Sequence, residues 1–305
     1  MKDVLIAGRP IGPSRLPYVI AEMSGNHNGE LERALEIVDA AADAGAHALK
    51  LQTYTADTIT LDAEGAEFTI DDPGSLWYGR TLHSLYDKAH TPWEWHGAIF
   101  ARCAERGIAC FSSPFDETAI EFLENLDAPA YKIASFENTH LPLIRMAAST
   151  GKPLIISTGM ATGDELAEAV QTARDAGCKD LILLKCTSTY PAEPTNTNLN
   201  TIPDMRERYG CQVGLSDHTL GIGVPLALVV FSSSVIEKHF TLSREQGGVD
   251  SAFSLEPLEL AELVTQSRRV WQALGAVSYG PIAAEEDSLQ FRRSLYVAKD
   301  MRAGE

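Results

Sequence analysis

Residues able to do chemistry recur at the ends of eight short apolar runs. The eight sets are Glu22; Lys50 and Gln52; Ser112 and Ser113; Lys132 and Ser135; Ser157 and Thr158; Thr187, Ser188 and Tyr190; Ser216, Asp217 and His218; and Glu237 and His239. His218 and His239 end consecutive runs, so their imidazoles can meet if these runs are neighbouring strands. Two such imidazoles can bind one divalent cation and leave coordination positions open for water or substrate. A satisfied structural histidine is the alternative for either ring taken singly.

The run from Ser234 to Leu242 carries three ionisable residues inside a strand-like apolar sequence. Side chains alternate along a strand, so Glu237 and His239 are expected to share one face. Lys238 is then expected on the opposite face, where its long stem can reach the surface. A nearby carboxylate, Glu22 or Glu237, could orient a metal-bound water or take part in proton transfer.

Lys50 and Lys132 also interrupt apolar runs. An uncompensated ammonium in such a place is costly, so each lysine needs an anion. The anion could be a structural Asp or Glu, or the phosphate or carboxylate of a substrate. The hydroxyls that would add donors around one such anion belong to Ser113, Ser135, Ser157 and Ser216.

Composition restricts the function classes. The 305 residues contain 25 Lys and Arg against 42 Asp and Glu, a formal net charge of -17 that would repel nucleic acid and anionic membranes. The five cysteines form no C-x-x-C pair, which favours buried thiols in a reducing cytoplasm over a disulfide framework. We expect no signal peptide and no membrane span, because Gly and Pro break up the N-terminal apolar residues and no run of about 18 apolar residues follows.

The eight apolar runs alternate with helical sequence, which predicts a (β/α)8 TIM barrel. The runs are residues 18–23, 47–54, 108–115, 130–135, 154–160, 181–188, 212–218 and 235–241. A doubly wound open sheet is the alternative, but no G-x-G-x-x-G follows the first run. Residues 1–17 are expected to form a hairpin against the barrel floor, and the long connection 55–91 is expected to shape a site.

Several motifs together resemble the sialic acid synthase family, whose members join phosphoenolpyruvate to a six-carbon amino sugar. They are "AEMSGNHNG", "KLQTYT", "FSSPFD", "YKIASFE", "STGMAT", "KCTSTYP", "GLSDHT", "EKHFTL" and "GVDSAFSLEP", and they run in order through almost the whole chain. Within the family, "SGNHNG", "PGSLWYGRTLHSLYDKAHTPWEWH", "KCTSTYP" and "DSAFSLEP" are most similar to the branch whose product is pseudaminic acid. The branches that make N-acetylneuraminate or legionaminate are the close alternative.

The resemblance implies a catalytic barrel followed by a small antifreeze-like domain that covers the partner's active site in a swapped homodimer. "RRSLYVAKDMRAGE", residues 292–305, reads as a new strand and resembles the start of that domain. We therefore expect a hairpin cap over residues 1–17, a barrel over 18–290, and at 291–305 the beginning of a truncated C-terminal domain. The missing part would include an arginine that helps to hold the sugar.

The resemblance also implies roles for single residues. His218 and His239 match metal ligands, for Mn²⁺ first and Mg²⁺ or Co²⁺ as alternatives, and Glu22 matches a catalytic glutamate. Contacts to phosphoenolpyruvate are implied for Lys50, Ser113, Lys132, Ser135, Ser157, Ser188 and Ser216, where Ser188 replaces an asparagine common in the neuraminate enzymes. Contacts to the sugar are implied for Gln52, Tyr190 and Asp250.

The implied reaction is a metal-dependent condensation of phosphoenolpyruvate with a diacetamido-trideoxy-altrose (6-deoxy-AltdiNAc). Cleavage of the C–O bond would give pseudaminic acid and phosphate. Two other classes remain open. One is an aldolase that forms a Schiff base on Lys132 or Lys185, and the other is an inactive sugar-binding protein.

Overall fold

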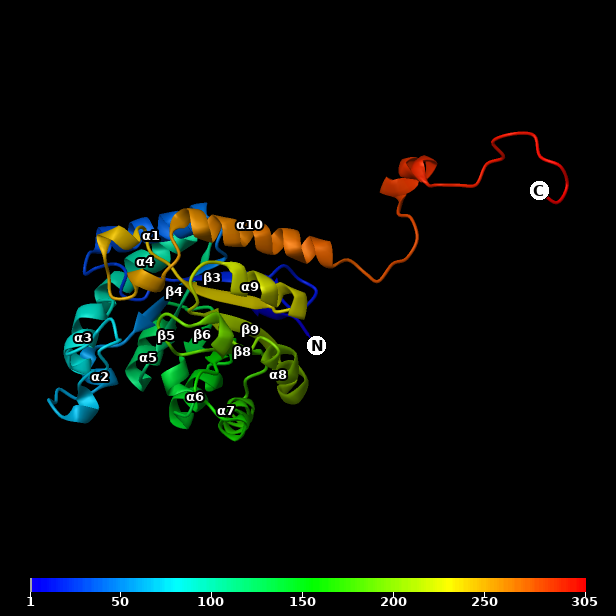
Figure 1. The fold of residues 1–305 in the computed structure, drawn as a ribbon. Coiled ribbons are helices and arrows are strands. Elements are labelled where there is room, and N and C mark those ends of the chain that lie inside the picture. Colours follow the sequence, from blue (N-terminus) through cyan, green and yellow to red (C-terminus); the bar gives the residue numbers. More distant parts are fainter. Residues whose placement is uncertain (1) are drawn as a thin grey trace. The chain divides into compact units, whose positions relative to one another are not determined.

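The eight apolar runs form a closed barrel of parallel strands in the computed structural model, which describes residues 2–305 (Figure 1). The order around the barrel is β10-β3-β4-β5-β6-β7-β8-β9. The strands are β3 (Tyr18–Glu22), β4 (Ala48–Thr53), β5 (Ala109–Pro114), β6 (Tyr131–Ile133), β7 (Leu154–Ser157), β8 (Leu181–Cys186), β9 (Gln212–Asp217) and β10 (Val235–His239). The predicted barrel is confirmed, and the doubly wound alternative is wrong.

Helices follow the strands and surround the barrel (Figure 1). They are α1 (Leu31–Asp43), α2 (Ala56–Ile59), α3 (Leu82–Ala89), α4 (Trp93–Glu105), α5 (Glu117–Asn125), α6 (Leu141–Ser149), α7 (Gly163–Asp175), α8 (Thr201–Tyr209), α9 (Gly223–Ala227) and α10 (Pro257–Leu274). Short 3₁₀ turns are η1 (Ala66–Phe68), η2 (Ser135–Glu137), η3 (Pro194–Asn196), η4 (Leu228–Phe231), η5 (Arg244–Gln246), η6 (Ser251–Phe253) and η7 (Ala283–Phe291).

Alternation along each strand divides the core into two layers. On β3, Val19 and Ala21 pack in the layer between strands and helices, whereas Ile20 belongs to the cluster inside the barrel. Inside the barrel, Gly214 of β9 leaves no room for a side chain, because a Cβ atom there would lie 2.4 Å from the carbonyl oxygen of Val235. The absent side chain lets β9 and β10, the strands that lead to the two histidines, approach closely.

The N-terminal hairpin closes the lower end of the barrel, as predicted. Strands β1 (Val4–Ile6) and β2 (Arg9–Ile11) pair in antiparallel fashion. Val4, Ile6 and Ile11 are buried in the same apolar cluster as the interior barrel residues. This end of the barrel therefore holds a packed apolar core.

The chain divides into two compact units, one up to Ala273 and one from Leu274 to Glu305. The second unit contains η7, but no strand forms at residues 292–305, so the strand expected there is wrong. A β-strand needs a neighbouring strand to pair its backbone groups. Among the described residues, no strand pairs with residues 292–305. The expected domain limits stay a prediction. None of the helices in residues 2–305 combines the length and apolar character that a membrane crossing requires.

Helix α4 is attached to the barrel by a buried neutral imidazole. The His96 Nε2 atom lies 2.9 Å from the hydroxyl of Thr53 on β4, and its Nδ1 atom lies 3.2 Å from the carbonyl oxygen of Pro92. Burial lowers the pKa of His96 from 6.5 to about 4. The unfolded chain therefore binds a proton below its ordinary pKa, while the folded chain stays neutral until the pH approaches the lowered value.

We expect acid to destabilise the protein through His96. Lowering the pH from about 7.5 to about 5 should cost on the order of 2 kcal/mol of unfolding free energy through this one group. The variant His96→Gln should be less stable near neutral pH, because it loses this packing, but should lose less stability on acidification. Urea unfolding at the two pH values measures the difference, and equal losses in both proteins would contradict the assignment.

Candidate active site

Four buried charges lie inside the barrel near its open end. The Lys50 Nζ atom lies 2.6 Å from Glu22 Oε2 and 3.9 Å from Glu237 Oε2, and the Lys132 Nζ atom lies 3.8 Å from Glu237 Oε1. All four side chains are at most 6% exposed. We call Glu22, Lys50, Lys132 and Glu237 the charge quartet. The anions that the two lysines require are thus carboxylates that themselves belong to the predicted site.

The quartet shifts the ionisation of its own members. Burial raises the pKa of Glu22 to about 7, although Lys50 opposes the shift. Burial would also raise the pKa of Glu237, but Lys132 and then Lys50 outweigh it and hold this pKa below its ordinary value. Burial lowers the pKa of Lys132, and Glu237 partly offsets this effect. Glu22 is therefore the member of the quartet able to exchange a proton near neutral pH.

The predicted serine hydroxyls lie in two groups. Near the quartet, the Lys50 ammonium donates to the Ser113 hydroxyl at 3.2 Å, and the Ser216 hydroxyl donates to Glu237 at 2.9 Å. The second group surrounds Gly159, where a Cβ atom would lie 2.1 Å from the Ser188 hydroxyl and 2.7 Å from the Ser135 hydroxyl. The structure thus places all these hydroxyls at the open end of the barrel.

One of the predicted serine hydroxyls is buried without a hydrogen-bond partner in the described residues. The Ser157 oxygen is buried at the end of β7 and is unpaired among residues 2–305. A buried polar group without a partner is costly, so this position favours a ligand that supplies one.

His218 and His239 meet at the rim of the barrel. Their ring centroids are 5.4 Å apart. The His218 Nδ1 atom lies 2.8 Å from the carbonyl oxygen of Thr187, which fixes the ring and leaves Nε2 for another partner. The His239 Nδ1 atom is buried without a hydrogen-bond partner in the described chain, and Asp250 Oδ2 lies 3.6 Å from it. Burial lowers the pKa of His239 well below its ordinary value, so the ring is neutral.

The pair fits an open metal site with two protein ligands. An ion shared by two ring nitrogens at about 2.1 Å would place the ring centroids roughly 4.5–5.5 Å apart, which agrees with the observed separation. No set of three or more His, Cys, Asp and Glu side chains in residues 2–305 is arranged around a single metal position. Such a two-ligand site leaves coordination positions open for water or substrate.

Aromatic rings and polar side chains form the outer part of the site. The Tyr190 ring centroid lies 4.3 Å from that of His218 and 5.3 Å from that of Phe253. Gln52 donates to Glu22 at 2.8 Å, and Asp250 is buried beside His239. The residues implied as sugar contacts, Gln52, Tyr190 and Asp250, thus border the quartet and the histidines.

Lys238 lies outside the barrel wall as expected, but it does not reach the surface. It is fully buried, and its Nζ atom lies 2.9 Å from Asp217 Oδ2. Asp217 also accepts from the backbone N–H and the hydroxyl of Thr219. The expectation of a surface lysine is wrong because a carboxylate on the neighbouring strand meets the ammonium within the helical layer. This ion pair joins β9 and β10 directly behind His218 and His239.

Two residues of the site escaped the sequence reasoning. Glu137, in η2, carries a buried carboxylate oxygen without a partner in residues 2–305, and burial raises its pKa to about 7 against the pull of Lys132. Cys186 lies inside the barrel at the end of β8, with its sulfur 3.9 Å from His218 Nδ1. The signal for Cys186 was alternation with Lys185, and for Glu137 it was the acidic residue in the turn after Lys132.

Comparison with known proteins gives the same picture. A model of the NeuB family matches residues 37–279. The chain is 44% identical to pseudaminic acid synthase of Campylobacter jejuni over 291 residues, which cover 94% of this chain and 83% of the relative. It is 41% identical to pseudaminic acid synthase of Helicobacter pylori over 95% of this chain and 85% of that protein.

A solved structure supports the fold. The N-acetylneuraminic acid synthetase of Leptospira borgpetersenii, in complex with citrate, superposes with a TM-score of 0.82 and 32% identity. The match covers 96% of this chain and 97% of that one.

We expect the Lys238 ion pair to matter because of its burial. Lys238→Met leaves Asp217 as an unpaired buried charge and should lower the unfolding free energy by about 3–5 kcal/mol. The double variant Lys238→Met/Asp217→Asn removes both charges, keeps an acceptor for Thr219, and should recover part of that loss. Denaturant unfolding checks this, with Arg15→Ala as control because the exposed Arg15–Asp3 pair should contribute about 1 kcal/mol or less. A double variant no more stable than the single one would contradict this account.

Glu137 should titrate near neutral pH. Infrared difference spectra between the wild type and Glu137→Gln should show a protonated carboxyl band that disappears as the pH rises through the raised pKa, about 7. Glu165 on α7 is exposed, and hydrogen bonds from Thr162 lower its pKa, so Glu165→Gln should reveal a carboxyl that ionises no higher than the ordinary acidic range. A Glu137 band that disappears in that same acidic range would refute the buried environment.

Proposed function

The chain belongs to the NeuB family, and on this premise we propose that it is a pseudaminic acid synthase, a transferase that condenses phosphoenolpyruvate with a diacetamido-trideoxy-altrose. The observation that carries the proposal is the arrangement of the barrel mouth. Two buried lysines lie among serine hydroxyls, and beside them lie the neutral ring of His239 and the hydrogen-bonded ring of His218. The sequence that contains them is 44% identical to a pseudaminic acid synthase.

The quartet would receive phosphoenolpyruvate. Lys50 and Lys132 offer the positive charge for its carboxylate and phosphate, and Ser113, Ser157 and Ser216 offer hydroxyl donors. In the free protein Glu22 and Glu237 balance these lysines. Binding of a substrate with two or three negative charges therefore favours uptake of a proton by the quartet. Glu22, with its pKa raised to about 7, is the member best suited to accept it.

The sugar would bind farther out, against Tyr190 and between Gln52 and Asp250. His218 and His239 would hold a divalent ion there, for which Mn²⁺ is our first choice. When bound, the ion supplies Lewis acidity that stabilises negative charge on the aldehyde oxygen of the open-chain sugar. Phe253 and Tyr190 pack around the two imidazoles and limit the access of bulk water to them.

The proposed reaction forms a C–C bond and breaks a C–O bond. C3 of phosphoenolpyruvate attacks the aldehyde carbon of the sugar, and water adds to C2 of the former enolpyruvate. Glu22, protonated when phosphoenolpyruvate binds, gives its proton to the aldehyde oxygen as the C–C bond forms and then takes a proton from the water. Cleavage of the C2–O bond releases phosphate together with the second proton of the water. One sugar, one phosphoenolpyruvate and one water thus give one nonulosonic acid and one phosphate. Lys50 and Lys132 hold the carboxylate and the phosphate of phosphoenolpyruvate in place while negative charge shifts within the substrate during the reaction.

The alternatives differ in the support they have. N-acetylneuraminate or legionaminate synthesis would use the same residues with another amino sugar. A Schiff-base aldolase has less support, because Lys132 faces Glu237 and Lys185 points away from the barrel interior to contact Thr187. An inactive sugar-binding protein also has less support, because a neutral sugar does not require the four buried charges of the quartet.

Three further parts of the proposal follow from the resemblance and from the thiols. We include a homodimer, a divalent metal as cofactor, and a cytoplasmic location. The location agrees with five cysteines that are all buried as free thiols.

One assay tests the function. Phosphate release from phosphoenolpyruvate is measured with a panel of amino sugars, with and without Mn²⁺. We expect release with the diacetamido-trideoxy-altrose and Mn²⁺, and loss of release with a chelator. Release with N-acetylmannosamine alone would move the chain to the neuraminate branch. Borohydride trapping of a lysine adduct would support the aldolase, and no release with any sugar would refute the synthase.

The variant His239→Ala tests the metal ligands within this scheme. Removing one of two protein ligands should lower Mn²⁺ affinity and metal-dependent turnover by about 100-fold or more, with the fold retained. Mn²⁺ binding is measured by electron paramagnetic resonance without substrate, so the result does not depend on turnover. His140 is exposed, and His140→Ala should bind Mn²⁺ as the wild type does. Equal affinities in all three proteins would refute the metal assignment.

A further inference from the structure

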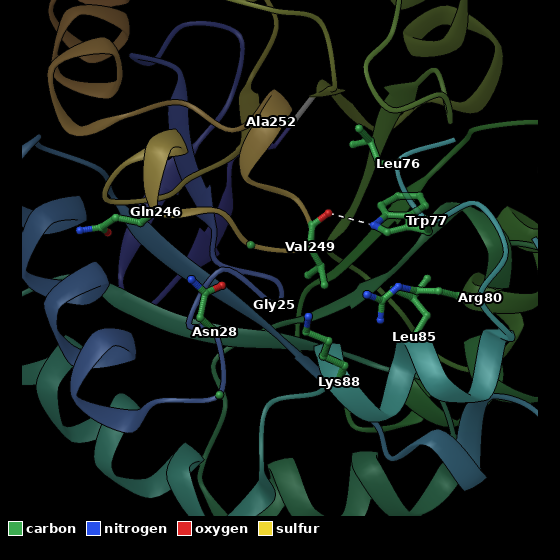
Figure 2. Close-up of a pocket in the computed structure, with 12 residues that line it drawn as sticks. Gly25, Asn28, Leu76, Trp77, Arg80, Leu85, Lys88, Gln246, Val249 and Ala252 are labelled. Carbon is green, nitrogen blue, oxygen red and sulfur yellow. Dashed lines mark hydrogen bonds between the residues drawn. The ribbon is translucent and has the colours of Figure 1, made fainter. Parts of the chain in front are cut away.

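A cavity of about 530 Å³, distinct from the space around the charge quartet, opens beyond the carboxyl ends of the barrel strands (Figure 2). Its walls come from the loops that follow β3, β4 and β10, which are neighbours in the barrel. Asn28 comes from the first loop, Trp77 and Arg80 from the long connection, Lys88 from α3, and Val249 from the loop after β10. The Trp77 indole N–H donates to the carbonyl oxygen of Val249 at 2.9 Å and joins two of these walls.

The positive charge of the connection 55–91 is concentrated in this cavity. The segment contains seven acidic residues and only two Lys or Arg, which are Arg80 and Lys88. Both line the cavity, and in Figure 2 their side chains point into the same space. The cavity lining includes no Asp or Glu. Within residues 2–305, neither the Arg80 guanidinium nor the Lys88 ammonium has an ion-pair partner, although many carboxylates lie in the same segment.

The cavity shares a wall with the candidate active site. Gly25 follows Ser24, whose hydroxyl accepts from Gln52 at 3.2 Å. Val249 precedes Asp250, which lies beside His239. The Trp77 ring centroid lies 6.0 Å from that of Tyr190. Three wall residues of the cavity are thus each adjacent to a side chain of the site.

A protein with a net charge of -17 repels a small anion before the two meet. The buried lysines of the quartet cannot offset this repulsion at a distance, because Glu22 and Glu237 neutralise them. Two uncompensated cations at the rim can offset it locally, and such rim charges mainly affect association rates and their salt dependence.

We propose that Arg80 and Lys88 form an anion-attracting vestibule that collects phosphoenolpyruvate from solution and passes it to the quartet. The vestibule is defined by Asn28, Trp77, Arg80, Lys88 and Val249. The inference rests on the proposed function for the identity of the anion. The neutral amino sugar gains nothing from these charges, so the vestibule acts on one substrate of the two.

The test compares two double variants with the same change of net charge. Arg80→Gln/Lys88→Gln removes the cations of the vestibule. Arg145→Gln/Lys179→Gln removes two exposed cations elsewhere, one on α6 and one before β8, where strands begin at the far end of the barrel. Steady-state rates are measured with phosphoenolpyruvate and with sugar varied in turn, from about 20 mM to about 500 mM salt.

We expect the vestibule variant to lose about 3- to 10-fold in kcat/KM for phosphoenolpyruvate at low salt. The loss should shrink as salt rises, and KM for the sugar should stay at the wild-type value. The control variant should lose little. Equal losses in the two variants would overturn the vestibule, because they would reflect net charge alone. A raised KM for the sugar with an unchanged KM for phosphoenolpyruvate would also overturn it and indicate a sugar subsite.

Failure of the proposed function is a separate result. If the wild type turns over no sugar, phosphoenolpyruvate binding is measured by calorimetry with the same three proteins. Weaker binding in the vestibule variant alone, at low salt, would retain the vestibule without the synthase. Identical binding in all three proteins would overturn it.

Discussion

The charge quartet is the constraint on which the rest of the site depends. Two ammonium groups and two carboxylates are held inside a barrel at distances of 2.6–3.9 Å, away from water. Their burial is tolerable only because each charge faces an opposite one, so Glu22, Lys50, Lys132 and Glu237 must be placed together. A closed ring of strands achieves this, because residues from β3, β4, β6 and β10 then converge on one axis. An anionic ligand that binds to Lys50 or Lys132 must therefore compete with Glu22 and Glu237.

Much of this arrangement could be predicted from the sequence because strand alternation is a simple rule. The spacing of Lys50 and Gln52, or of Glu237 and His239, already assigned them to the barrel interior, and the structure places them there. The eight strands were identifiable because each apolar run is short and ends in polar residues. The roles of these residues in binding and catalysis stay predictions, since position alone does not assign chemistry.

The rest depended on contacts between segments distant in sequence. Lys238 was expected at the surface, but its partner Asp217 belongs to another strand and appears only when β9 and β10 are adjacent. Glu137 gave no periodic signal, because it lies in a turn and not in a strand. The strand expected at residues 292–305 failed for a related reason: local propensity does not supply a pairing neighbour. The cavity beside Trp77 is built from three loops and has no signature in any one of them.

The hairpin of β1 and β2 has a consequence for kinetics. Apolar side chains fill the bottom of the barrel, so ligands reach the site from the open end alone. If phosphoenolpyruvate binds at Lys50 and Lys132 and the sugar binds above it, phosphoenolpyruvate must bind first, because a bound sugar would block its path. Inorganic phosphate, which forms deepest in the site, would then leave after the nine-carbon product or pass beside it.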